Sequence, residues 1–196
     1  MNGDEPRSAV VGVAGNGRCS GVVVGPNFVL TSDHCVNAVG TEVAIVDAFG
    51  TQVVGRVCAK SATTRLALLC CMPIRSSSVA IAATAPAAGT LVEIESRPPR
   101  QQAWRASSRV SDASPGELTI HSISDRRLPD SGDSGSPAFV DDTLVGVLQE
   151  VRGPCGEVAV YTSMAPAANW VHLGMQQHAP SCLDWIRRAG RAAPSR

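Results

Sequence analysis

Two short segments carry residue types that together could perform nucleophilic hydrolysis. In the first, residues 132–137 read Gly-Asp-Ser-Gly-Ser-Pro, so glycines lie close to Ser134 on both sides. Glycine permits a sharp loop whose backbone N–H groups converge beside the hydroxyl, which is the arrangement that an oxyanion hole requires. The plain alternative is a surface turn rich in glycine and serine.

The second segment places a histidine one hundred positions before Ser134. Residues 30–35 read Leu-Thr-Ser-Asp-His-Cys, so His34 follows a predicted strand and precedes a cysteine. An imidazole within reach of a serine hydroxyl can accept its proton and make it a nucleophile. A lone histidine is more often structural, so it is the combination of the two segments that favours catalysis.

The elements that must position these segments are predicted to be short strands. Apolar runs separated by turns containing Gly, Pro, Asn or Asp predict them along most of the chain. The predicted strands are residues 9–14, 19–24, 28–32, 41–46, 51–58, 66–72, 91–96, 104–110, 117–120, 136–140, 143–149 and 158–162. Residues 76–89 are interpreted as the connection between two halves. A partial apolar face predicts a helix at 166–177, and residues 187–196 are expected to fray.

The two segments resemble the histidine and serine boxes of the trypsin/chymotrypsin family, in the same order and at a similar separation. Residues 143–147, Val160-Tyr161-Thr162 and Asn169-Trp170-Val171 extend the resemblance over most of the chain. It implies an all-β fold with two six-stranded antiparallel β-barrels and a C-terminal α-helix. We expect one domain, 1–196, with barrel one at about 8–75, barrel two at about 90–163, and the helix and tail at 164–196.

The resemblance also implies a role for individual residues. His34 would be the base, Ser134 the nucleophile, and the backbone N–H groups of Gly132 and Ser134 the oxyanion donors. No acid is expected at the base of the specificity pocket, so cleavage should follow small or medium apolar residues. The residues implied for this pocket are Leu128 at its base and Val151 and Ala159 on its walls.

One departure from the family is serious. The family's third catalytic residue, an Asp, precedes a Leu-Ala-Leu-like strand, and Arg65 occupies that position here, with no Asp or Glu anywhere between positions 50 and 89. Losing this acid costs related enzymes about 10⁴ in rate. Arg65 is expected to turn its flexible side chain to solvent. Asp33 and Gln149 are possible surrogates that could orient His34, although Asp33 also fits the description of a solvated loop carboxylate.

Seven cysteines are many for a cytosolic protein of this size. Their spacing includes no Cys-x-x-Cys pair, so no metal site is predicted. Disulfides formed in an oxidising compartment explain the count better than buried thiols do. The resemblance implies a disulfide between Cys19 and Cys35 that closes the histidine loop.

The partners of the other five cysteines stay open. The family commonly has a cysteine four residues before the nucleophile, and this chain has an aspartate there. Cys155 therefore lacks its usual mate and would either bond Cys182 or remain free. The remaining candidates form one cross-strand pair, Cys58 with either Cys70 or Cys71.

The amino-acid composition of the chain disfavours some classes of binding partner. The chain has 17 basic and 17 acidic residues and no net charge, so nucleic acid and anionic membranes are poor partners. No apolar run approaches the about 20 residues of a membrane span. We expect a monomer that acts on a peptide or protein substrate without a metal or other cofactor. It would be secreted or periplasmic, its signal segment being absent from this chain, and a cytoplasmic location stays open.

The family's activation signal is also missing. Activated members begin with Ile-Val-Gly-Gly and pair this new N-terminus with the Asp before the nucleophile, but residues 7–12 read Arg-Ser-Ala-Val-Val-Gly. Activation of that kind is not expected, so Asp133 must find another donor or act as a staple within its loop. The leading hypothesis is a serine endopeptidase with a weakened catalytic triad. The alternative is an impaired homologue that binds peptides or proteins.

Overall fold

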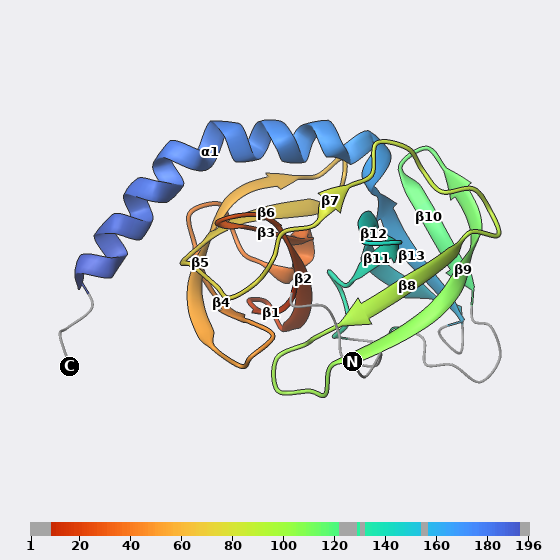
Figure 1. Cartoon of the computed structure of the whole chain (residues 1–196), viewed down its shortest axis with the longest axis horizontal. Coiled ribbons are helices and arrows are strands. Elements are labelled where there is room, and N and C mark those ends of the chain that lie inside the picture. Colours follow the sequence, from red (N-terminus) through yellow and green to blue (C-terminus); the bar gives the residue numbers. More distant parts are fainter. Residues whose placement is uncertain (1–8, 122–128, 130–131, 154–156, 193–196) are drawn as a thin grey trace.

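Two barrels lie side by side beneath one long helix (Figure 1). The computed structural model describes residues 9–121, 129, 132–153 and 157–192. The elements are β1 (Val10–Ala14), β2 (Arg18–Gly25), β3 (Phe28–Ser32), the 3₁₀ turn η1 (Asp33–Cys35), β4 (Glu42–Val46), β5 (Gln52–Ser61), β6 (Leu66–Cys71), β7 (Ala80–Ile81), β8 (Leu91–Ser96), β9 (Trp104–Ser114), β10 (Glu117–His121), β11 (Pro137–Val140), β12 (Thr143–Arg152), β13 (Val158–Ser163) and α1 (Met164–Ala192).

The first barrel closes in the strand order β1-β2-β3-β6-β5-β4. Its strand β6 is buried along its whole length. Because side chains alternate between the faces of a strand, Ala67 and Leu69 fill the barrel interior while Leu66 and Leu68 face the core shared with α1. Because both faces of β6 are covered, its sequence is a continuous run of apolar residues.

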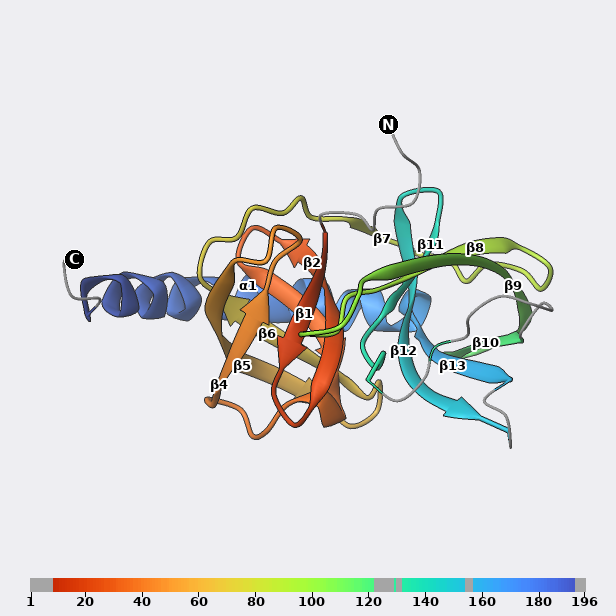
Figure 2. The ribbon, with the colours of Figure 1, turned by 90° about the horizontal axis from the view of Figure 1, so that it is seen from below.

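The second barrel has the order β11-β8-β9-β10-β13-β12, and the pairing of β11 with β12 closes it. Together the two barrels and the terminal helix confirm the predicted fold class, and Figure 2 shows them from a second direction. Residues 76–89 were expected to be only a connection. They also contain β7, which runs parallel to β12 and extends its edge.

The helix α1 is much longer than the expected 166–177, and part of the segment expected to fray is helical. Its buried residues recur at helical spacing on one face, and they pack on both barrels. Pro180 lies inside the helix, where it removes one backbone hydrogen bond. Beyond it, Cys182 and Trp185 are buried against the first barrel, and this packing offsets the loss.

Two disulfides are present among the described residues. The predicted bond Cys19–Cys35 is confirmed. The second joins Cys70 of β6 to Cys182 of α1, so of the two alternatives for Cys155, the bond to Cys182 is wrong. Cys155 itself lies outside the described residues.

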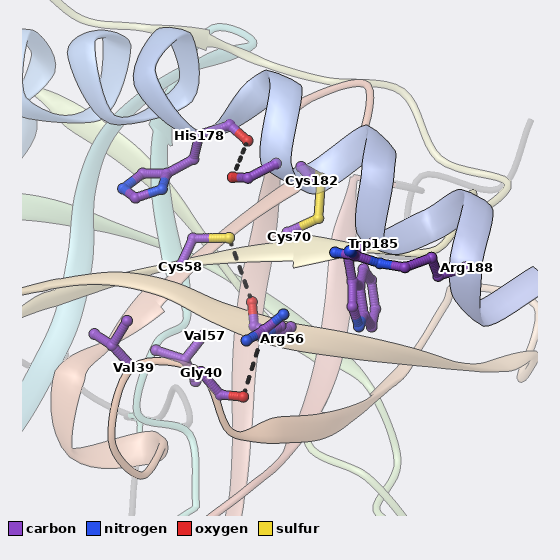
Figure 3. A pocket seen from close by; sticks show the side chains of 11 residues that line it. Val39, Gly40, Arg56, Val57, Cys58, Cys70, His178, Cys182, Trp185 and Arg188 are labelled. Carbon is purple, nitrogen blue, oxygen red and sulfur yellow. Dashed lines mark hydrogen bonds between the residues drawn. A yellow bond between two sulfur atoms is a disulfide. The ribbon is translucent and has the colours of Figure 1, made fainter.

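The expected cross-strand pair of Cys58 with Cys70 or Cys71 is also wrong, because Cys58 and Cys71 are free thiols. The ladder between β5 and β6 shifts register at Cys58, so this residue has no partner directly opposite. Figure 3 shows Cys58 beside the Cys70–Cys182 bond, in a hollow of about 220 Å³ beneath α1.

We predict that replacing Cys182 with Ser lowers the free energy of unfolding by about 4 to 5 kcal/mol. The bond spans 112 residues, and a loop of that length strongly restricts the unfolded chain. Denaturant unfolding without reductant measures the effect, with Cys58→Ser as a matched control that breaks no bond. Equal stabilities of the two variants would contradict the prediction.

Candidate active site

One backbone carbonyl joins the two segments that the sequence singled out. The carbonyl oxygen of Leu148, on β12, accepts a hydrogen bond from Ser32 Oγ at 2.5 Å and another from the Gly135 N–H at 2.9 Å. Ser32 lies two residues before His34, and Gly135 directly follows Ser134. The two segments therefore meet at the junction of the barrels.

The backbones of the two barrels approach each other closely at this junction. Gly135 has a φ of +82°, and a Cβ at this position would overlap both the carbonyl oxygen of Ser20 and the hydroxyl of Thr31. Ser20 in turn donates its N–H to the carbonyl of Ser134 at 2.8 Å. Only glycine provides both the left-handed backbone and the space.

In the loop around Ser134, two backbone N–H groups make no hydrogen bond within the described part of the chain. The N–H groups of Gly135 and Ser136 are bonded to carbonyl oxygens. Those of Gly132 and Ser134 donate to no residue in the described part of the chain. An oxyanion hole needs two such uncommitted donors beside the nucleophile.

The main chain of His34 is firmly anchored. It lies in η1, and the Cys19–Cys35 disulfide ties the next residue to β2. Asn16 adds two hydrogen bonds from the β1–β2 turn, one to the carbonyl of Cys35 at 2.8 Å and one to that of His34 at 3.3 Å.

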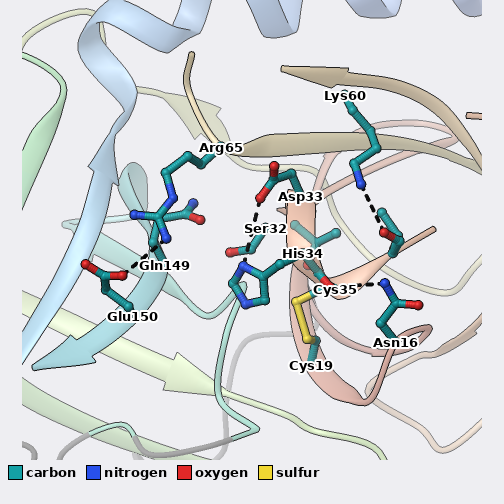
Figure 4. Close-up of polar contacts among 12 residues, drawn as sticks. Asn16, Cys19, Ser32, Asp33, His34, Cys35, Lys60, Arg65, Gln149 and Glu150 are labelled. Atoms are coloured by element: carbon teal, nitrogen blue, oxygen red, sulfur yellow. Dashed lines mark hydrogen bonds and ion pairs between the residues drawn. A yellow bond between two sulfur atoms is a disulfide. The ribbon is translucent and has the colours of Figure 1, made fainter. Parts of the chain in front are cut away.

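The His34 ring faces Asp33. Its Nδ1 lies 3.9 Å from Asp33 Oδ1, and 46% of the side chain is exposed (Figure 4). Because Nδ1 faces Asp33, Nε2 is the ring nitrogen directed away from this carboxylate. The ring and the Ser134 hydroxyl, both described, are not hydrogen-bonded to each other. Such bonds are often long in unliganded enzymes and shorten when substrate binds.

Arg65 is paired rather than simply turned to solvent. It has a φ of 56°, and its carbonyl accepts a hydrogen bond from the Asp33 N–H at 2.9 Å. The side chain is half-exposed, but its Nη2 lies 3.3 Å from Glu150 Oε2. Glu150 also binds Arg152, with Nε at 2.7 Å. The residue at the position where the resemblance predicts an acid is thus a cation that pairs with a carboxylate from the other barrel.

Gln149, the second possible surrogate, makes no hydrogen bond to the His34 ring among the described residues. Its side chain is only 3% exposed, and its Nε2 donates weakly to the carbonyl of Val147 at 3.4 Å. Its Oε1 is buried without a partner in the described part of the chain. It lines a hollow of about 240 Å³ that Arg65 also borders.

Several groups influence the protonation of His34. Burial is the largest influence, and it lowers the pKa below the ordinary value of 6.5. Arg65 and Lys60 lower the pKa further, whereas Asp33 and Glu150 raise it. The net effect is a lowered pKa, so the ring is neutral, as a base must be, at neutral pH.

The residues implied for the specificity pocket are only partly placed. Val151 of β12 and Ala159 of β13 lie opposite each other in the ladder, so they can share a wall. Leu128 lies outside the described residues.

Sequence reasoning missed the partners of Asp133. This carboxylate is fully buried, and its Oδ1 accepts hydrogen bonds from Trp104 Nε1 at 3.0 Å and from Ser96 Oγ. The sequence predicts that Asp133 needs a hydrogen-bond donor, but no motif identifies Trp104 and Ser96 as the donors.

Within the described ranges, no cluster of three or more His, Cys, Asp or Glu residues could hold a metal ion. None of the helical segments described there has the length and apolar character needed to cross a membrane.

We predict that Arg65→Asn raises the pKa of His34, because it removes a cation that lowers this pKa. Asn tolerates the left-handed backbone, so the substitution adds little strain. An NMR titration of the His34 ring measures the change, with Arg187→Asn on the exposed end of α1 as the control. An unchanged or lower pKa in Arg65→Asn would show that Arg65 does not act on the ring.

Comparison with known proteins agrees with the fold. The chain is similar in structure to the scabies mite inactivated protease paralogue S-I1, with a TM-score of 0.72, 19% identity, and coverage of 88% of this chain and 98% of that one. It is also similar to HBP, with a TM-score of 0.69, 16% identity, and coverage of 88% and 95%. A third similar structure is the inactive form of the Rv3671c protease, with a TM-score of 0.71, 17% identity, and coverage of 83% and 87%.

These identities are low, so the structural likeness concerns the fold alone. No curated protein matches the chain in sequence. The trypsin-like peptidase domain family, however, matches residues 19–147, well over half of the chain. The chain therefore belongs to the family of trypsin-like peptidase domains.

Proposed function

We propose that this protein is a serine endopeptidase in which Ser134 is the nucleophile and His34 the general base. The observation that carries the proposal is the shared acceptor at Leu148, which holds the segments of both residues at one junction. The uncommitted N–H groups of Gly132 and Ser134 support it, because they supply the two donors that acyl transfer requires.

The proposed reaction proceeds through an acyl-enzyme. His34 Nε2 accepts the hydroxyl proton as Ser134 Oγ attacks the peptide carbonyl, and the Gly132 and Ser134 N–H groups bind the developing oxyanion. The proton then passes from His34 to the leaving amine. Water repeats the sequence and releases the acyl group, again with His34 as base.

Asp33 is the better candidate to orient His34. Its carboxylate faces Nδ1, and a shortening of the 3.9 Å separation would give the hydrogen bond that fixes the tautomer. Gln149 is the weaker candidate because its amide is directed to the carbonyl of Val147. Asp33 is half-buried, so it would act as a partial replacement for the family's buried acid.

A second candidate function follows from Arg65. A cation at the position of the third catalytic residue disfavours the imidazolium that forms during the reaction. The scaffold could then serve as a peptide- or protein-binding module. Two of the similar structures are named as an inactivated protease paralogue and as the inactive form of a protease. Under either function, the two disulfides favour an oxidising location, secreted or periplasmic.

We predict that a fluorophosphonate labels the protein once, at Ser134, and that Ser134→Ala abolishes labelling. Asp33→Asn should slow labelling by at least about tenfold, since it weakens the orientation of His34. Gln149→Met should have a much smaller effect. Mass spectrometry of the labelled chain over time measures all four proteins. A wild-type protein that stays unlabelled would favour the binding module, and a larger effect of Gln149→Met would exchange the roles of the two surrogates.

We predict that cleavage follows small or medium apolar residues. Val151 and Ala159 offer no charge to a bound side chain, and a buried guanidinium without a partner is costly. Chromogenic peptides that differ only at this residue should therefore favour Ala or Val over Arg by at least about tenfold in kcat/KM. Faster cleavage after Arg would refute the assignment of the pocket.

A further inference from the structure

Asp133 directly precedes the proposed nucleophile in the sequence, and its side chain is shielded completely from water. A buried charge is stable only when hydrogen-bond donors compensate for the lost hydration. Trp104 Nε1 and Ser96 Oγ both donate to Asp133 Oδ1, the former at 3.0 Å. These two residues are paired with each other at one end of the β8–β9 ladder, so a single position in the second barrel presents both donors.

The same residues connect Asp133 to the first barrel. Ser96 Oγ lies 3.1 Å from Ser20 Oγ, which also accepts a hydrogen bond from the Arg97 N–H at 2.9 Å. The backbone N–H of Ser20 then reaches the carbonyl of Ser134 at 2.8 Å. Residues 133 and 134 are therefore held from both barrels by one continuous set of hydrogen bonds.

Asp133 also shapes its own loop. Its carbonyl accepts the Ser136 N–H at 3.0 Å, which closes a tight turn around Ser134. Gly132, on the other side, has a φ of +109°. The direction of the Asp133 side chain therefore constrains where the N–H groups of Gly132 and Ser134 point, because the carboxylate and these amides belong to one short segment.

We propose that Trp104 and Ser96 are positioning residues that hold Asp133 and so keep the N–H groups of Gly132 and Ser134 in place as oxyanion donors. The proposal rests on the proposed function and extends it. The resemblance assigns a charged N-terminus as the partner of this carboxylate, and in this chain an indole N–H and a hydroxyl donate to it.

The substitution Trp104→Phe tests the proposal because it keeps an aromatic ring and removes the N–H. Trp185→Phe is a matched control, since Trp185 is 8% exposed and Trp104 is 9% exposed. Both variants are first compared with the wild type in thermal unfolding, and Ser96→Ala replaces Trp104→Phe if that variant does not fold. We expect kcat of Trp104→Phe to fall at least about tenfold with KM little changed, because a hydrogen bond to a buried charge is lost. Trp185→Phe should retain the wild-type kcat.

A second readout does not depend on activity. Hydrogen exchange of the amides of residues 132–136 is measured on the full chain by mass spectrometry, and it should be faster in Trp104→Phe than in the wild type or Trp185→Phe. If the wild type proves inactive, the proposed function fails, and faster exchange in Trp104→Phe still supports the positioning role. Unchanged exchange overturns the inference, as does a kcat that falls equally in both variants or in neither.

Discussion

The structure depends on a contact between the barrels that is too close for any side chain. Gly135 packs its backbone directly against Ser20 and Thr31, and Leu148 accepts hydrogen bonds from both sides of the same junction. This contact brings a loop of the second barrel to the end of β3 in the first. The position of the serine hydroxyl relative to the histidine is therefore set by backbone packing rather than by a direct bond between the two side chains.

The charged groups around His34 differ from those that the resemblance predicts, and two carboxylates partly offset the difference. Arg65 occupies the position where the resemblance predicts an acid, Glu150 pairs with it, and Asp33 faces the ring from the histidine's own segment. The two carboxylates raise the pKa of His34, while burial and the cations Arg65 and Lys60 lower it. The ring stays neutral and able to accept a proton, but the imidazolium gains less support than a buried acid would give.

Much of the fold could be predicted because its strands alternate or are uniformly apolar, as in β6, and because the histidine and serine boxes are local motifs. The length of α1 could not, since Pro180 is a reliable local signal for ending a helix, and only burial of Trp185 against the other barrel overrides it. The Cys70–Cys182 pair depends on the same docking. The hydrogen-bond partners of Asp133 could not be predicted either, because they also depend on tertiary packing. Trp104 is distant from Asp133 in sequence, and its pattern indicates only a strand residue.

The long helix has a mechanical consequence for the junction of the barrels. α1 starts at the end of β13 in the second barrel and is covalently fastened to β6 in the first, while residues 72–90 join the barrels by a separate route (Figure 1). Because two separate segments connect the barrels, the barrels resist separation. Under the proposed function, a polypeptide substrate would have to reach Ser134 without any separation of the barrels, which favours an extended segment over a folded one.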